Sequence, residues 1–301
     1  MAIDILLLGR DGQVGWELQR SLAPLGKIIA PGRAECDLAN ADQLRSFVRA
    51  VRPALIVNAA AYTAVDKAET DQDQARAING AAPGILAEEA NKLGAWLVHY
   101  STDYVFDGTS SGPYTEQDAP APLSVYGATK LEGEQAIRQA GCRHLIFRTS
   151  WVFAARGGNF ARTILRLARE RETLKIVGDQ YGAPTSAELL ADVTALCVHD
   201  VMQSGGEAKQ GLYHLVADGR TSWHGYARFV LEQAARLGCA LKCHPDKVES
   251  IPTSGFPLPA RRPANSILDT AKLKGEFGLC LPHWTYHAER MLRELLSKED
   301  A

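Results

Sequence analysis

The sequence predicts an α/β fold: a doubly wound parallel sheet with a smaller, partly discontinuous C-terminal domain. Short apolar runs alternate with longer helical patterns through the first half of the chain, and a glycine-rich turn follows the first run. Strands separated by helices in this way pair in parallel through right-handed crossovers. After residue 150 the alternation weakens, and from residue 218 onward proline and glycine are frequent, which indicates a second domain of different architecture.

The elements follow one another along the chain. Helices begin where an apolar period of about 3.6 residues starts and end near glycine or proline, as at Gly26 and Pro53. In the first half, the expected strands are 3–8, 27–30, 55–58, 96–101 and 144–149, and the expected helices are 14–25, 41–51, 72–93 and 124–140. In the second half, the expected helices are 160–171, 188–202, 223–237 and 283–297, and the expected strands are 174–177 and 211–216.

The late strands set the predicted domain boundaries. Residues 1–150 form the first domain, and strands from about 172–217 are expected to rejoin its sheet. Residues 218–301 form the second domain, with contributions from about 151–171. We expect this second domain to lie over the carboxyl edge of the sheet and to bind the substrate.

The composition excludes several classes of protein. The 301 residues contain 33 Lys and Arg and 35 Asp and Glu, so a net charge of −2 provides no field that attracts nucleic acid or an anionic membrane. No apolar stretch approaches the ~18 residues that span a bilayer, and the run before Gly9 is too short for a signal peptide. The six cysteines form no zinc motif. We expect a cytoplasmic protein whose partners are neither nucleic acid nor membrane.

Three glycines, Gly9, Gly12 and Gly15, follow the first strand directly, with Gln13 and Val14 between the last two. A pyrophosphate needs backbone N–H donors at a helix start and no Cβ in the way, and this spacing supplies both. Alone, such a triplet is equally compatible with an ordinary turn. Because it lies between a strand and a helix, it favours dinucleotide binding in a Rossmann fold, and residues 1–150 are predicted to be that domain.

The end of the second strand indicates which dinucleotide is bound. An acidic residue in this place usually binds the ribose hydroxyls of NADH. The sequence has Arg33 instead, which suits the 2′-phosphate of NADPH unless it is a solvated surface charge. Glu35 is near enough to leave NADH open, and Asp37 and Leu38 follow in a loop suited to adenine. NADPH is therefore favoured.

Small side chains follow the third strand at Ala59, Ala60 and Ala61, directly after Asn58. They suit a place where the backbone must approach the cofactor. A tightly packed strand end explains the same residues equally well.

Tyr126 and Lys130 lie one turn apart on a predicted helix face. An ammonium beside a phenol would lower the pKa of the phenol from ~10 toward neutrality, where it can donate or accept a proton. This spacing is by itself common on exposed helix faces. Here it follows a glycine-rich turn and a strand that ends in Ser101 and Thr102, which makes it a candidate catalytic pair.

Together these motifs resemble the extended short-chain dehydrogenase/reductase family, and more narrowly its reductases of nucleotide-sugar 4-keto groups. The resembling stretches are 12–18, 57–69, 100–108, 148–153, 180–185 and 262–266. The resemblance implies hydride transfer from the nicotinamide to the keto carbon. Tyr126 would be the proton donor, Lys130 the cofactor anchor and modulator of the Tyr126 pKa, and Thr102 the hydrogen-bond donor to the carbonyl.

The resemblance also implies a substrate and further contacts. The substrate would be dTDP-4-dehydro-L-rhamnose, reduced to dTDP-L-rhamnose for bacterial cell-surface polysaccharide such as the O-antigen. The sugar nucleotide would contact Asp103, Trp151 and Arg262, and the cofactor would also contact Ala61, Tyr62, Thr63 and Tyr100. Alternatively, Trp151 is a core aromatic residue and Arg262 forms a salt bridge between domains.

Two other functions fit parts of the pattern. Sugar-nucleotide dehydratases and epimerases share the fold, but the dehydratases carry Glu after the Thr-Asp pair, where this chain has Tyr104, a poor base at pH 7. A non-catalytic dinucleotide-binding regulatory subunit could retain Tyr126 and Lys130. Consumption of NADPH with a 4-keto sugar nucleotide distinguishes an enzyme from such a subunit.

Some members of the family form homodimers around Mg²⁺ held by glutamates. The matching positions here are Glu17, Glu188 and Glu294. Carboxylates on separate helices suit Mg²⁺, a hard cation that prefers oxygen ligands. All three could equally be exposed helix residues, so the sequence leaves a magnesium-bridged homodimer as one of two interpretations.

Overall fold

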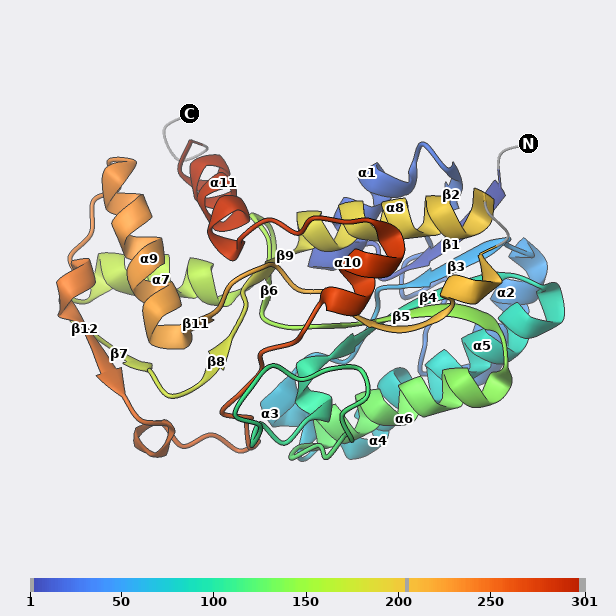
Figure 1. The fold of residues 1–301 in the computed structure, drawn as a ribbon, viewed down its shortest axis with the longest axis horizontal. Coiled ribbons are helices and arrows are strands. Elements are labelled where there is room, and N and C mark those ends of the chain that lie inside the picture. The colour runs from blue at the N-terminus through green and yellow to red at the C-terminus, as the bar shows by residue number, and fades with distance from the viewer. Residues whose placement is uncertain (1–2, 204–205, 298–301) are drawn as a thin grey trace.

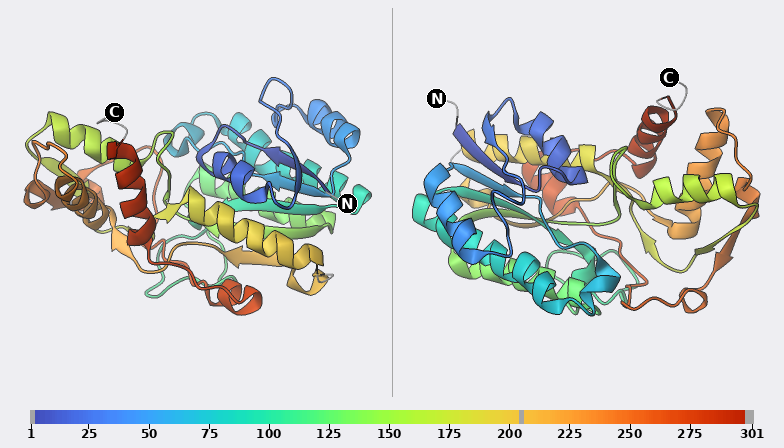
Figure 2. Two further views of the ribbon diagram at one scale, coloured as in Figure 1. Left: turned by 90° about the horizontal axis from the view of Figure 1, so that it is seen from above. Right: turned by 180° about the vertical axis from the view of Figure 1, so that it is seen from behind.

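The structure is a computed structural model that describes residues 3–203 and 206–297. Within these ranges, a central sheet of six parallel strands has the order β10-β5-β4-β3-β1-β2 (Figures 1 and 2). Because the chain starts inside the sheet and extends it on both sides, the doubly wound fold is confirmed. The strands are β1 (Ile3–Leu8), β2 (Gly26–Ile29), β3 (Leu55–Asn58), β4 (Trp96–Thr102), β5 (Arg143–Thr149) and β10 (Gly211–His214).

Helices cover both faces of this sheet (Figure 1). One face carries α1 (Gln13–Leu22) and α8 (Ala187–Gln203), and the other carries α2 (Ala41–Val51), α5 (Ala82–Leu93) and α6 (Val125–Ala140). Alternate residues of each strand enter different cores: Ile5 and Leu7 pack in one cluster, whereas Leu6 and Leu8 pack in the other. Continuous apolar strands are needed here because both faces are buried.

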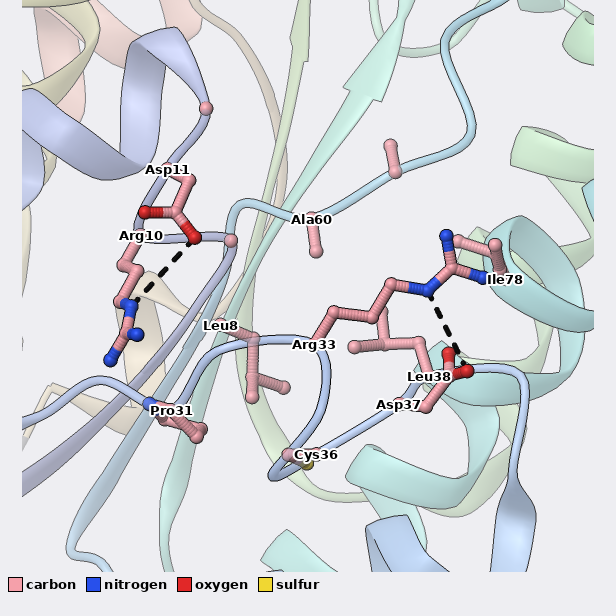
Figure 3. A pocket seen from close by; sticks show the side chains of 13 residues that line it. Leu8, Arg10, Asp11, Pro31, Arg33, Cys36, Asp37, Leu38, Ala60 and Ile78 are labelled. Carbon is pink, nitrogen blue, oxygen red and sulfur yellow. Dashed lines mark ion pairs between the residues drawn. The ribbon is translucent and has the colours of Figure 1, made fainter.

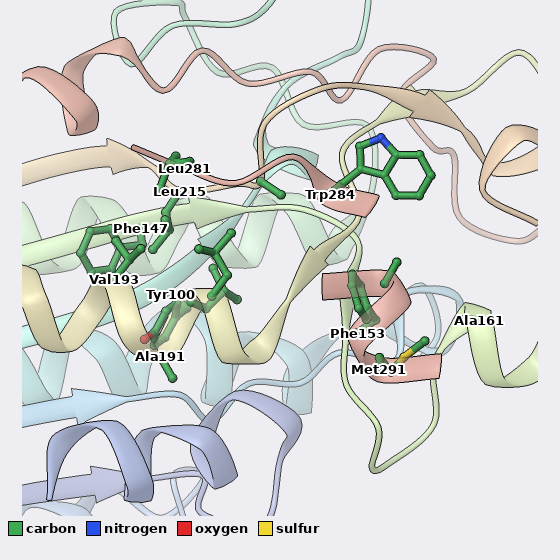
Figure 4. Close-up of a cluster of buried hydrophobic side chains, with 14 of the residues drawn as sticks. Tyr100, Phe147, Phe153, Ala161, Ala191, Val193, Leu215, Leu281, Trp284 and Met291 are labelled. Atoms are coloured by element: carbon green, nitrogen blue, oxygen red, sulfur yellow. The ribbon is translucent and has the colours of Figure 1, made fainter. Parts of the chain in front are cut away.

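A smaller part of the molecule lies beyond the carboxyl ends of the strands (Figure 1). It contains α7 (Phe160–Glu170), α9 (Trp223–Arg236) and α11 (Trp284–Ser297). Its short strand pairs are β6 (Val152–Phe153) with β9 (Thr185–Ser186) and β8 (Tyr181–Gly182) with β11 (Thr221–Ser222). Phe153, Trp284 and Met291 belong to the same hydrophobic cluster as Tyr100 and Phe147 of the sheet, so one core continues between the two parts (Figure 4).

One predicted sheet strand is wrong. We expected residues 174–177 to rejoin the central sheet, but β7 (Leu174–Val177) pairs in parallel with β12 (Val248–Ile251) in a separate two-stranded sheet. The other late strand, β10, pairs with β5 as expected. Both late segments are short apolar runs, and the sequence does not specify which one pairs with β5.

The predicted helix 72–93 is divided. It consists of α4 (Gln72–Arg76), a π-helical turn η1 (Ala77–Ala81) and α5. Pro83 has no N–H to continue the α-helical ladder to the carbonyl of Asn79, and the wider turn accommodates this loss. The remaining elements are α3 (Val65–Ala68), α10 (Ala271–Phe277), η2 (Asp103–Val105), η3 (Glu207–Lys209), η4 (Pro245–Lys247) and η5 (Thr253–Gly255). No helix in the described ranges combines the length and apolar composition needed to cross a bilayer.

Candidate active site

The glycine turn between β1 and α1 places backbone against backbone at the carboxyl edge of the sheet. Gly9 has a φ of +89°, and a Cβ on it would lie 2.6 Å from the backbone nitrogen of Ala60. A Cβ on Gly15 would lie 2.0 Å from the carbonyl oxygen of Gly9. Gly12 precedes α1, whose first turn has neither a side-chain cap nor an acidic residue. The positive end of this helix therefore suits an anion such as a pyrophosphate.

A cavity opens beside this turn (Figure 3). Arg33 lies at its rim, 75% exposed, and forms an ion pair of 3.6 Å with Asp37. The cavity volume of about 200 Å³ is smaller than that of a typical whole-ligand site, so it suits one end of a dinucleotide. Its lining includes the predicted residues Gly9, Gly12, Arg33, Asp37, Leu38, Ala60 and Ala61, together with Leu8, Arg10, Asp11, Pro31, Cys36 and Ile78.

Arg10 is a cavity residue that the sequence motifs did not identify. Its guanidinium donates to the carbonyl oxygen of Ala30 at 2.5 Å and lies 3.7 Å from Glu35. Glu35 also accepts from the backbone N–H of Gly32 at 2.6 Å. Glu35, the residue that kept NADH binding possible in the sequence analysis, is therefore already paired with Arg10 and with the backbone of Gly32. The position of Arg10 inside the glycine turn could have indicated this role, because the turn holds Arg10 beside the end of the second strand.

Several predicted cofactor residues lie outside this cavity. The Gln13 side chain accepts from Asn159, and Val14 and Ala59 pack against the core. Tyr62 is fixed by its hydroxyl, which donates to Asp71, and Thr63 is exposed. Gly15 acts through its close contact with Gly9.

The side chain of Tyr100 does not reach the candidate site. We expected it along the cofactor, but its side chain lies in the core, where its hydroxyl is 2.6 Å from the hydroxyl of Thr194 on α8. The alternation of side chains along β4 directs Tyr100 away from His99 and Ser101, its two neighbours. Its contribution to the site comes from the backbone, because its carbonyl oxygen accepts from the Lys130 Nζ at 2.6 Å.

The start of α6 positions the candidate catalytic tyrosine. Ser124 caps the helix by accepting from the N–H of Gly127 at 3.2 Å. A Cβ on Gly127 would lie 2.1 Å from the carbonyl oxygen of Tyr104, so glycine lets the helix start approach the 3₁₀ turn η2 that follows β4. There the side chain of Thr102 lies close enough to Tyr126 to lower the pKa of its phenol. The structure thus brings together Thr102 and Tyr126 from segments 24 residues apart in sequence.

The prediction that the pKa of Tyr126 is lowered toward neutrality is wrong. Burial raises the pKa of the phenol to about 12, more than the hydrogen bond from Thr102 lowers it. The Lys130 Nζ donates to the carbonyl oxygen of Tyr100 at 2.6 Å and lies 3.2 Å from the His99 Nε2. Burial lowers the pKa of Lys130 to about 8. Tyr126 is therefore a protonated phenol at neutral pH.

Asn79, in the π-helical turn, is another residue that the sequence did not reveal. It is fully buried and clamps the loop after β3: its Oδ1 accepts from the N–H of Tyr62 at 2.9 Å, and its Nδ2 donates to the Tyr62 carbonyl at 3.0 Å. Nδ2 is also 3.4 Å from the hydroxyl of Thr129 on α6. Asn79 thereby links the loop after β3 to helix α6. A polar residue four positions before Pro83 was the available signal.

Asp103 and Tyr104 also lie near the Tyr126 phenol. Asp103 is buried, and burial raises its pKa to about 7 despite hydrogen bonds with Ser266 and Thr102. The rings of Tyr104 and Tyr126 pack edge to face at 5.8 Å. Burial raises the pKa of Tyr104, which makes it an even poorer base than an ordinary tyrosine.

Arg262 bridges this cluster to helix α3, which is distant in sequence. Its Nη2 is 2.8 Å from a carboxylate oxygen of Asp66, and its Nη1 is 3.0 Å from the other. A hydrogen bond to Tyr104 also contributes to raising the pKa of the guanidinium. The alternative of a salt bridge between separate parts of the chain therefore describes Arg262 in this structure. Its remaining surface lines the groove described next.

A groove of about 1210 Å³ adjoins Arg262 in the smaller part of the molecule. Its lining mixes aromatic, apolar and cationic groups, including Phe160, Trp223, Phe256, Leu258 and Arg261. Trp151 stacks on Trp223 with ring centroids 3.6 Å apart. Trp151 has a φ of +48°, a conformation that costs a bulky residue about 1–3 kcal/mol and is concentrated at functional sites. The groove has the size and chemistry for a ligand with a flat base and a diphosphate.

The magnesium prediction is not supported. No group of His, Cys, Asp or Glu in the described ranges is arranged to hold a metal ion. The predicted glutamates do influence one another, since burial raises the pKa of Glu17 and the charges of Glu188 and Glu294 add to the effect. Two of these carboxylates form ion pairs with arginines, since Arg20 is 3.4 Å from Glu17 and Arg290 is 3.0 Å from Glu188. The homodimer stays a prediction.

Comparison with known proteins agrees with this geometry. The model of a family described as RmlD substrate binding domain matches residues 3–297. The dTDP-4-dehydrorhamnose reductase of Escherichia coli (strain K12) is 51% identical over 299 residues, covering 98% of this chain and 99% of that protein. The enzyme of the same name from Burkholderia thailandensis is 49% identical over 296 residues, with the same coverage.

A solved structure is similar over the same length. The crystal structure of dTDP-4-dehydrorhamnose reductase from Bacillus anthracis str. Ames in complex with NADP has a TM-score of 0.86 and 32% identity, covering 99% of this chain and 100% of that one. These matches confirm the narrower resemblance seen in the motifs. The chain belongs to the RmlD substrate-binding-domain family.

Proposed function

We propose that this chain reduces the 4-keto group of dTDP-4-dehydro-L-rhamnose to give dTDP-L-rhamnose, with NADPH as the reductant. Two findings on relatives support the reaction and the cofactor: the E. coli relative is named for this reductase activity, and the B. anthracis relative was crystallised with NADP. The supply of the product to O-antigen and a cytoplasmic location stay predictions.

The observation that carries the proposal is that the side chain of Thr102 lies close enough to Tyr126 to lower the pKa of its phenol. Two hydroxyl groups at one point suit a carbonyl oxygen, which accepts from both. A phenol with a pKa of about 12 is protonated at neutral pH, and an alkoxide is a stronger base than a phenolate, so Tyr126 can donate its proton to the reduced oxygen. NADPH, when bound, supplies the hydride.

Two separate sets of residues would bind the cofactor and the sugar nucleotide. Gly9, Gly12 and Gly15 would hold the pyrophosphate, because their bare backbones leave room at a helix start. Arg33 and Arg10 would meet a 2′-phosphate at the rim of the cavity. On the other side, Asp103, Trp151 and Arg262 would contact the sugar nucleotide, with the base in the groove beside Trp223.

The test is an assay of the purified protein with dTDP-4-dehydro-L-rhamnose and NADPH. We expect NADPH oxidation in proportion to substrate, and NMR of the product should show dTDP-L-rhamnose. The corresponding UDP sugar, present in a parallel reaction, tests recognition of the base. Tight NADPH binding without oxidation would instead support a non-catalytic binding protein and contradict the proposal.

A further inference from the structure

Charged side chains of both signs lie around the glycine-turn cavity. Arg10 is 3.7 Å from Asp11 and 3.7 Å from Glu35, and Arg33 is 3.6 Å from Asp37. Figure 3 shows the pairs that Arg10 forms with Asp11 and Arg33 with Asp37. Two arginines and three carboxylates leave one negative charge among these five groups. A phosphate that enters here therefore meets carboxylates that already occupy its arginines.

The three carboxylates are held in different ways. Asp11 extends into solvent, with its side chain 86% exposed. The Asp37 Oδ1 accepts from the N–H of Ala39 at 3.0 Å, within its own loop. The Glu35 Oε2 accepts from the N–H of Gly32 at 2.6 Å, and the same oxygen faces Arg10. Glu35 is thus the carboxylate on which a backbone N–H and a guanidinium converge.

The backbone holds both of these donors in place. The carbonyl oxygen of Gly32 accepts from the N–H groups of Glu35 and Cys36, each at 3.0 Å, which closes a tight turn. The Arg10 Nη1 donates to the carbonyl oxygen of Ala30 at 2.5 Å. A Cβ on Gly32 would lie 2.9 Å from the Arg10 Nη2, so the guanidinium packs against the turn. A backbone N–H and a guanidinium directed at one oxygen form an anion site.

This anion site lies just after β2, where a Rossmann domain places the 2′ substituent of the adenosine ribose. Its neighbours Pro31, Arg33 and Cys36 line the cavity, as does Arg10. The Glu35 side chain is 61% exposed, so its carboxylate can leave the two donors and enter water. In place, the carboxylate is an acceptor for a 2′-hydroxyl. A 2′-phosphate would compete with it for the same N–H and the same guanidinium.

We propose that Glu35 determines the choice between NADH and NADPH by occupying the place of the 2′-phosphate with its own carboxylate. NADH binds with Glu35 in place and donates its 2′-hydroxyl to the carboxylate. NADPH binds by displacing Glu35, and its 2′-phosphate then accepts from Gly32 and Arg10. Cofactor preference therefore depends on one displaceable carboxylate and not on Arg33 alone. This inference rests on the proposed function, because it takes the cavity to hold the adenosine end of the cofactor.

Binding of NADPH and NADH to Glu35→Gln tests the proposal, because the two cofactors differ only at the 2′ position. The amide keeps the size of the side chain and an oxygen for the Gly32 N–H, but it carries no charge. Fluorescence titration should show a Kd for NADPH about fivefold lower at low salt, with a smaller gain at high salt, because exposed charges are screened. The Kd for NADH should rise or stay the same. Glu35→Ala, which vacates the place, should strengthen NADPH binding at least as much.

Two further carboxylates separate occupancy of the site from a general effect of charge. Asp11→Asn removes the same charge at the same 3.7 Å from Arg10, but from a side chain that extends into solvent. It should lower the Kd for NADPH less than about twofold, since exposed ion pairs are weak. Glu232→Gln breaks a pair of equal length with Arg228 on α9 and should change neither Kd. Arg10→Met should weaken binding of NADPH more than binding of NADH.

Three results would overturn the proposal. An unchanged Kd for NADPH in both Glu35 variants would mean that the carboxylate only stabilises the turn. An equal gain in Asp11→Asn would reduce the effect to charge in general. An equal gain for NADH would remove the 2′-phosphate from the explanation. Because these titrations need no turnover, the expected pattern of affinities in a protein that does not reduce the sugar nucleotide would contradict the proposed function alone.

Discussion

On the proposed cofactor side, the cavity is lined by residues 8–12 at the end of β1, by five residues between Pro31 and Leu38 after β2, and by Ala60, Ala61 and Ile78. On the substrate side, the groove is lined by α7, by the β7 region, by Trp223 and by residues 251–262. The cavity depends on close packing of backbone against backbone, because a Cβ on Gly9 or Gly15 would clash with neighbouring backbone atoms. The groove depends on aromatic side chains that tertiary packing brings together. Substitutions on the first side should therefore change KM for NADPH, and substitutions on the second side should change KM for the sugar nucleotide.

The largest effect is expected where the two sides meet. Tyr126→Phe removes the proton donor and keeps the ring that packs against Tyr104. We expect turnover to fall at least about 100-fold, the usual scale for loss of a general acid. NADPH affinity, measured by fluorescence titration, should change little. Near-normal turnover in this variant would show that the hydroxyl is not the proton donor.

On the cofactor side, Gly15→Ala should act through the backbone. The new Cβ would lie 2.0 Å from the Gly9 carbonyl oxygen, so the turn must shift. Displacement of a binding loop has large kinetic consequences, and we expect KM for NADPH to rise about tenfold or more, with a lower Tm. Gly275→Ala is the matched control, because a Cβ there has open space within helix α10. That variant should keep its KM and gain slightly in thermal stability. An unchanged KM in Gly15→Ala would remove the glycine turn from the cofactor site.

On the substrate side, Trp223→Leu should act through the side chain. It removes the ring that stacks on Trp151 at 3.6 Å. An aromatic pair contributes about 0.5–1.5 kcal/mol beyond its buried area, so we expect KM for the sugar nucleotide to rise about 3- to 10-fold. KM for NADPH should stay the same, and Tyr286→Leu, at a 61% exposed position, should change neither constant. A rise in the NADPH constant instead would contradict the separation of the two sides.

The smallest effect is expected at the rim of the cofactor cavity. Arg33 is 75% exposed, so a 2′-phosphate contact there is screened by solvent. Arg33→Asp should raise KM for NADPH about threefold at low salt and less at high salt, while KM for NADH should fall or stay constant. Arg236→Asp makes the same charge change at the exposed end of α9 and should have no effect. If KM for NADPH is the same in both variants, Arg33 is only a solvated surface charge.

The distinction between the two sides also explains what could be predicted. The glycine turn, the Tyr126–Lys130 pair and the strand end at Thr102 are local patterns, and the structure brings Thr102 and Tyr126 into contact. Arg10 and Asn79 were missed because their roles depend on which loop lies opposite them. For Tyr100, the motif gives its position in the strand but not the face on which its side chain lies.

The sequence by itself determined the doubly wound sheet, because the period of its apolar residues and the length of its crossovers leave few ways to pair the strands. It also determined the candidate catalytic residues, since their chemistry requires fixed spacing on one helix. Tertiary structure alone decided that β10 and not β7 joins β5, and that Arg262 meets Asp66, 196 residues away in sequence. It also decided the direction in which the pKa values of Lys130 and Tyr126 shift. A pKa depends on burial and on the partners that packing places around a group, and neither is encoded in the spacing of the motif.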